Sequence, residues 1–164
     1  MIASADELLT HLADLVEEIE RLAVAVLPPN DEDQIALGRE PDGSLVIDLE
    51  CVPPTSRRKA AVDMEIFERW RPAGHDQYER SDYRFELRHR ELDYRRAFHR
   101  HGEGHFLAAY DVATHEHCEV TMGHVVCRHY GGDPIVDAHD GFARVYDAWL
   151  SNRKPDCSAL SCLD

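Results

Sequence analysis

The N-terminal segment has the apolar spacing of an amphipathic helix. Apolar side chains recur every three or four residues, which places them on one face of a helix: Leu8, Leu12, Leu15, Ile19, Leu22 and Val26. Ser4 and Glu7 have the spacing of a capping box, in which a hydroxyl and a carboxylate bind free amides of the first turn. Two consecutive prolines then end the pattern. The spacing predicts an N-terminal helix within residues 1–27.

The middle of the chain alternates between apolar and polar residues, as strands with one buried face do. The alternation covers residues 45–49, 62–70, 83–88, 94–98 and 125–130. Along 62–70, for example, Val62, Met64 and Ile66 fall on one face, whereas Asp63 and Glu65 fall on the other. We expect the strands on either side of Arg90 to form a hairpin.

Helical spacing returns near the C-terminus. Asp140 is a candidate N-cap, and the apolar face that follows consists of Phe142, Val145, Tyr146 and Trp149. This pattern predicts a C-terminal helix over 138–151 and an irregular tail over 153–164. A helix, a strand-rich segment and a second helix predict an α+β fold with a central, mostly antiparallel sheet. We expect one domain over residues 1–152, with a strand-rich, histidine-containing core over 45–136.

The composition is that of a soluble globular protein. The 164 residues are 43% hydrophobic and 30% charged, and no apolar run approaches the ~20 residues that a membrane-spanning helix needs. The N-terminus lacks the basic start and apolar core of a signal peptide, and the five cysteines lack the spacing of a secreted disulfide framework. We therefore expect a cytoplasmic protein with reduced thiols and no membrane partner.

The net charge of −14 is unevenly distributed. The excess of acidic side chains lies mainly before residue 67, whereas residues 67–130 are nearly balanced. An acidic surface repels nucleic acid and anionic membranes at long range, so an anionic ligand is expected only in the middle segment. The acidic first helix also allows a non-enzymatic interpretation, in which its apolar stripe is partly exposed and the helix binds a basic partner.

Histidines are concentrated in one part of the chain, with nine of the eleven between His75 and His129. Imidazole binds metal ions and transfers protons near neutral pH, so this segment is the candidate functional site. Residues two apart on a strand lie on the same face, about 6.6 Å apart along the chain. Three pairs have this spacing: His99 with His101, His115 with His117, and Cys127 with His129.

One interpretation of these pairs is a metal site. A His-x-His pair on a strand supplies two imidazoles to one ion, and a third ligand from a neighbouring strand completes a zinc-like site with an open position. The candidate ligands are His115, His117, Cys127 and His129, with His99 or His101 as alternative third ligands. The expected cofactor is Zn²⁺ or another divalent transition metal.

A second interpretation is acid–base cleavage of RNA without a metal. This chemistry needs a base, an acid and a cation that holds the phosphate, and a carboxylate can orient an imidazole through its other N–H. The candidate catalytic residues are His99, His101, Asp111, His115, His117 and Arg96.

A third interpretation is that the histidines line the polar face of a sheet whose other face forms the core.

Several short motifs point to a known family. Tyr83–Arg100 is a strand pair rich in Tyr and Arg, Tyr110-Asp111 is followed by His115-Glu116-His117, and Phe142–Leu150 is the final helix. Over about residues 80–150 this arrangement resembles the TumE-type toxin family, although Val112 stands where that family has Asn. The resemblance implies a toxin of a toxin–antitoxin pair that acts on RNA through Asp111, His115 and His117. The expected partners are RNA or a cognate antitoxin-like protein, and a homodimer is left open.

Overall fold

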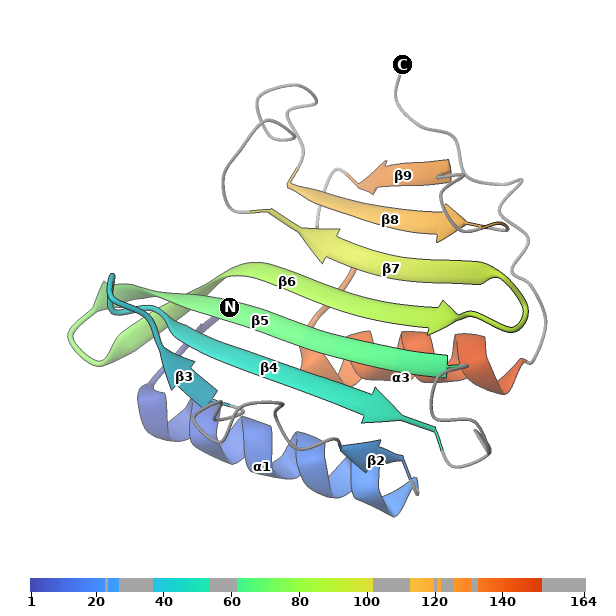
Figure 1. Ribbon diagram of the computed structural model, residues 1–164. Coiled ribbons are helices and arrows are strands. Elements are labelled where there is room, and N and C mark those ends of the chain that lie inside the picture. The colour runs from blue at the N-terminus through green and yellow to red at the C-terminus, as the bar shows by residue number, and fades with distance from the viewer. Residues whose placement is uncertain are drawn as a thin grey trace.

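The computed structural model describes residues 1–22, 24–26, 37–53, 62–101, 113–119, 121, 126–130 and 133–151; for residues 25–26 and 126–129 it describes the backbone alone. In this part of the chain, nine strands form one sheet and two helices pack against it (Figure 1). The predicted α+β layout is therefore confirmed. The predicted tail, residues 153–164, lies outside the described residues.

The strands pair in antiparallel fashion throughout the described sheet. In chain order the elements are β1 (Ile2–Ala3), α1 (Ala5–Arg21), β2 (Ala25–Val26), β3 (Leu37–Arg39), β4 (Leu45–Val52), β5 (Val62–Gly74), β6 (Gln77–His89), β7 (Tyr94–Arg100), β8 (Thr114–Glu119), β9 (Val126–Tyr130) and α3 (Ala138–Leu150). The main path runs β2-β4-β5-β6-β7-β8-β9, while β1 pairs with β6 and β3 with β4. The hairpin expected near Arg90 is confirmed as the β6–β7 connection.

The first helix begins as predicted but is shorter than predicted. The Ser4 hydroxyl accepts the Glu7 N–H at 3.2 Å, and the Glu7 carboxylate accepts the Ser4 N–H at 2.7 Å, so the capping box is present. The helix ends at Arg21, because residues 25–26 leave it to pair with the end of β4. The helix therefore occupies Ala5–Arg21 of the predicted range 1–27, and residues 2–3 form a short strand.

Both helices cover the same face of the sheet (Figure 1). Ile66, Phe85 and Phe98 are register neighbours on β5, β6 and β7, and they share one buried apolar cluster with residues of both helices. The helical members are Leu15, Ile19, Phe142 and Val145. Leu15 and Ile19 of the α1 stripe are buried in this core, whereas Leu12 and Leu22 are partly buried at its edge. Binding of a basic partner by this helix stays a prediction. Both helices fall short of the length and apolar content that a bilayer-spanning helix requires.

The cap of the second helix differs from the prediction. Asp137, rather than Asp140, is the N-cap residue of α3, and its carboxylate accepts the Asp140 N–H at 2.9 Å. Asp140 instead lies in the first turn, where its carboxylate accepts the Val136 N–H. Both aspartates therefore satisfy amides near the positive end of the helix dipole.

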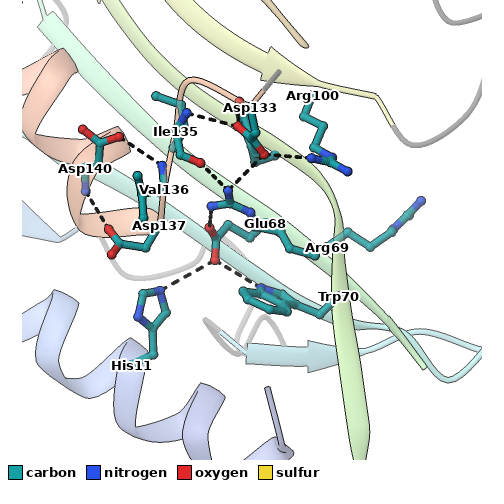
Figure 2. Close-up of polar contacts among 12 residues, drawn as sticks. His11, Glu68, Arg69, Trp70, Arg100, Asp133, Ile135, Val136, Asp137 and Asp140 are labelled. Carbon is teal, nitrogen blue, oxygen red and sulfur yellow. Dashed lines mark hydrogen bonds and ion pairs between the residues drawn. The ribbon is translucent and has the colours of Figure 1, made fainter. Parts of the chain in front are cut away.

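A buried arginine attaches the segment before α3 to the sheet (Figure 2). Arg80 on β6 donates to Glu68 on β5, to the Asp133 carboxylate and to the Ile135 carbonyl. Asp133 also accepts from Tyr83 at 2.7 Å and from Arg100 at 2.8 Å. This network, which the sequence patterns did not predict, fixes the chain as it leaves the sheet and enters α3.

Candidate metal centre

The four histidines of β7 and β8 lie on one face of the sheet. His99 is the register partner of His115, and Ala97 is the partner of His117. Because residues two apart share a face, His101 lies on the same face as His99. Phe98, the strand neighbour of His99, belongs to the core that the helices cover. The histidines therefore lie on the opposite face from both described helices.

Three of these imidazoles form a compact group of nitrogen donors. One ring nitrogen from each of His99, His101 and His115 lies within 4.8 Å of the other two. The His101 and His115 rings stack with centroids 4.9 Å apart, and the His99 and His115 centroids are 5.2 Å apart. A tetrahedral ion with Zn–N bonds of about 2.0–2.1 Å separates its nitrogens by about 3.4 Å. Binding such an ion would therefore require the nitrogens to move closer together than the 4.8 Å within which they lie in the structure.

His117 lies beside this group. Its ring centroid is 4.6 Å from that of His115 and 4.9 Å from that of His99. Neither of its ring nitrogens, both buried, has a hydrogen-bond partner among the described residues. Burial, together with the nearby His99 and Arg95, lowers the pKa of His117 to about 4. The ring is therefore neutral at pH 7, which is the state that can donate a lone pair.

A buried carboxylate adjoins the group on the β6 side. Glu86 is 2% exposed, and its Oε2 lies 3.8 Å from Nε2 of His99. Arg95 donates to the same oxygen at 2.6 Å, and Arg88 donates to the other. Burial alone would raise the pKa of Glu86, but the neighbouring His99, Arg95 and Arg88 hold it well below its usual range. Glu86 is therefore a fixed anion and a pure acceptor.

Glu86 belongs to a series of ion pairs that crosses the same face. Arg95 also donates to Glu119 on β8 at 2.7 Å, so it links β6 to β8. Arg88 reaches Asp63 and Glu65 on β5 as well as Glu86. The series connects four strands and ends beside the histidines, so it holds β7 and β8 in a fixed position.

The predicted site residues divide into three groups. His99, His101, His115 and His117 come together as described. Cys127 and His129 are the register partners of His117 and His115 on β9, but their side chains lie outside what the structure describes. Asp111 also lies outside the described residues. Of the four ligands first considered for a metal site, His115 and His117 have described side chains; His115 belongs to the compact group of three, and His117 lies beside it.

Arg96 does not belong to the site. It lies three residues from His99 and therefore on the other face of β7, where it forms an ion pair with Glu116 at 2.8 Å and covers the Phe98 ring. The prediction that Arg96 holds a phosphate beside the histidines is wrong for this reason.

Cys118 also departs from expectation. It is buried on β8 and disulfide-bonded, so the expectation of reduced thiols fails at this position. As a strand neighbour of His117, it belongs to the opposite face from the histidines.

Glu86 is the residue of this site that sequence reasoning missed. Its alternation with Phe85 and Leu87 does place it on the polar face of β6. Its contact with His99 runs diagonally between strands, however, and depends on the β6–β7 register.

Comparisons of the chain with protein-family models, with curated proteins and with solved structures found no match.

Proposed function

We propose that this protein binds a divalent first-row transition metal ion, with zinc the best fit, through His99, His101 and His115. The observation that carries the proposal is the convergence of three imidazole nitrogens from two adjacent strands to within 4.8 Å. Imidazole nitrogen is a preferred ligand for zinc, copper, nickel and iron, whereas calcium and magnesium prefer oxygen ligands.

The surroundings also favour a metal ion over a solvated polar face. His115 is 3% exposed and His99 is 9% exposed, so two of the three imidazoles are withdrawn from water. Imidazoles held this close together can share one bound ion through their ring nitrogens. The neutral ring of His117 adds no positive charge that would repel a cation.

Three protein ligands are typical of sites that leave a position open. An ion held by three imidazoles keeps a further coordination position for water or a substrate, whereas structural zinc sites are closed by four protein ligands. Among the residues that the structure describes, the ligand set therefore favours a site that acts on or binds a small molecule.

The test is metal binding by the full chain without an affinity tag. Metal content is measured by mass spectrometry, and Zn²⁺ affinity is measured by competition with a chromophoric chelator. We expect about one equivalent of metal, and we expect His101→Ala and His115→Ala each to weaken Zn²⁺ binding by at least tenfold. His75→Ala is the matched control, because His75 is exposed in the β5–β6 turn. Wild-type protein that does not bind Zn²⁺, or equal affinity in all four proteins, would contradict the proposal.

Ribonuclease activity, which the toxin resemblance implies, stays a prediction. The clustered histidines supply acid–base groups, but two arginines on their face are already paired with carboxylates. Arg84, the register partner of His99, pairs with Glu65, and Arg95 pairs with Glu86 and Glu119. Arg96 lies on the opposite face. A phosphate would have to compete with these carboxylates for the guanidinium. Unchanged RNA turnover and cell growth in a His115→Ala/His117→Ala variant would remove this prediction.

A further inference from the structure

Glu86 has more partners than a structural ion pair needs. Its carboxylate is already balanced by two arginines, Arg88 and Arg95, yet it also faces the imidazole of His99 at 3.8 Å. Glu119, the other buried carboxylate on Arg95, accepts from this arginine at 2.7 Å. The contact described for His99 is the one with Glu86.

A metal-bound histidine normally donates its second ring N–H to a carboxylate or carbonyl, which fixes the tautomer and the ring orientation. Nε2 is the nitrogen of His99 that lies nearest Glu86 in the structure. If Nε2–H points at this carboxylate, Nδ1 is the nitrogen left to bind an ion.

We propose that Glu86 is the positioning residue of the metal centre: its carboxylate accepts the Nε2–H of His99 and presents Nδ1 of that ring to the ion. This inference rests on the proposed metal binding. The inference adds which tautomer of His99 binds the ion and names Glu86 as the group that selects this tautomer. It also explains how the ion pairs between β5 and β8 hold the site in place.

The position of the carboxylate is set before any ion binds. Arg88 and Arg95 each donate to one of its oxygens, so the Glu86 side chain cannot rotate without breaking charge-assisted hydrogen bonds. Because β6 and β7 are paired along their length, the Glu86–His99 distance is fixed by the sheet as well. Closing 3.8 Å to hydrogen-bond distance requires only a small rotation of the imidazole.

The experiment compares Glu86→Gln with Glu119→Gln. Both substitutions remove one buried charge and one carboxylate partner of Arg95, and Glu86→Gln also replaces a carboxylate partner of Arg88. We expect Glu86→Gln to weaken Zn²⁺ binding by about 10–100-fold and Glu119→Gln to bind Zn²⁺ nearly as tightly as the wild type. Equal affinities in the two variants would overturn the inference, and urea unfolding of the metal-free proteins would show that both are folded.

A second measurement needs no variant. In the Zn²⁺-loaded wild type, long-range ¹H–¹⁵N correlation spectra identify which nitrogen of His99 carries the proton. We expect Nε2 to be protonated and Nδ1 to be metal-bound; the reverse tautomer would overturn the inference. If the wild type binds Zn²⁺ with the reverse tautomer, the inference about Glu86 fails but the proposed metal binding stands. If the wild type does not bind Zn²⁺, the proposed metal binding and the inference about Glu86 both fail.

Discussion

Arg80 and Glu68 form an ion pair inside the protein, with Nη1 of Arg80 3.0 Å from Oε1 of Glu68. Both side chains are almost completely buried, at 3% and 0% exposed. Burial raises the pKa of Glu68, and the neighbouring Arg80, His11 and Trp70 oppose that rise. Without Arg80, the buried carboxylate of Glu68 would lose its main counter-charge, which is costly inside a protein.

Replacing Arg80 with methionine should strongly destabilise the fold. Glu68 would lose its main counter-charge, and the segment before α3 would lose its attachment to β6. We expect the free energy of unfolding to fall by about 3–5 kcal/mol, measured by urea denaturation. The control is Arg84→Met, which breaks a half-exposed ion pair with Glu65 and should change the free energy of unfolding by about 0–1 kcal/mol.

The double variant Arg80→Met/Glu68→Gln distinguishes charge burial from lost packing. If the unpaired charge of Glu68 causes the loss, the double variant should be more stable than Arg80→Met alone. A double variant that is less stable than the single one would show that packing and the contacts to Asp133 dominate.

Gly141 allows α3 to lie directly on β6. A Cβ at this position would come within 2.5 Å of the Phe85 ring, which is fully buried. Gly→Ala in a helix normally stabilises by about 1 kcal/mol, but this clash should reverse the sign and give a net loss of about 1–3 kcal/mol. Thermal and urea unfolding of Gly141→Ala would measure it. Gly38→Ala is the control, because its Cβ meets no atom within 4 Å; a stabilised Gly141→Ala would contradict the close packing.

The capping box predicts a smaller, local effect. Ser4→Ala removes the acceptor of the Glu7 N–H at the start of α1. We expect a loss of about 0.5–2 kcal/mol in the free energy of unfolding. Thr10→Ala serves as the control, since that hydroxyl only donates back to the Asp6 carbonyl within the same helix. Equal, negligible losses in both variants would show that the N-terminus of α1 is not coupled to global unfolding.

The local part of this structure could be predicted from the sequence. The capping box, the apolar face of β5 and the β6–β7 turn follow from patterns within a few residues of each other. The same alternation placed each histidine pair on one strand face. The same alternation places Arg96, three residues from His99, on the other face of the strand. The assignment of Arg96 to the site overlooked this.

The convergence of the histidines could not be predicted in the same way. Periodicity says which face a residue occupies, but it does not say which strands are neighbours or in what register they pair. His99 meets His115 only because β7 pairs with β8 at that register. The contacts of Glu86 with His99, and of Arg80 with Asp133, likewise join residues from different strands or loops. Such contacts depend on the complete topology.

His117 should make the stability of the metal-free protein depend on pH. Its pKa is about 4 in the folded state, chiefly because of burial, against the ordinary value of 6.5. As the pH falls from 6.5 towards 4, the unfolded chain binds a proton at this histidine that the folded chain does not. The contribution of His117 to stability is therefore fully present above pH 6.5 and is lost during acidification.

Replacing His117 with glutamine should remove this part of the pH dependence. Urea unfolding in the presence of a chelator, at several values between pH 7 and 4, would give the slope of the unfolding free energy against pH. We expect the His117→Gln slope in this interval to be shallower than the wild-type slope by up to about 1.4 kcal/mol per pH unit, the value for one proton. His75→Gln, on an exposed turn, should keep the wild-type slope. If His117→Gln and wild type show the same slope, His117 is protonated equally in both states, and its burial beside His99 does not control its charge.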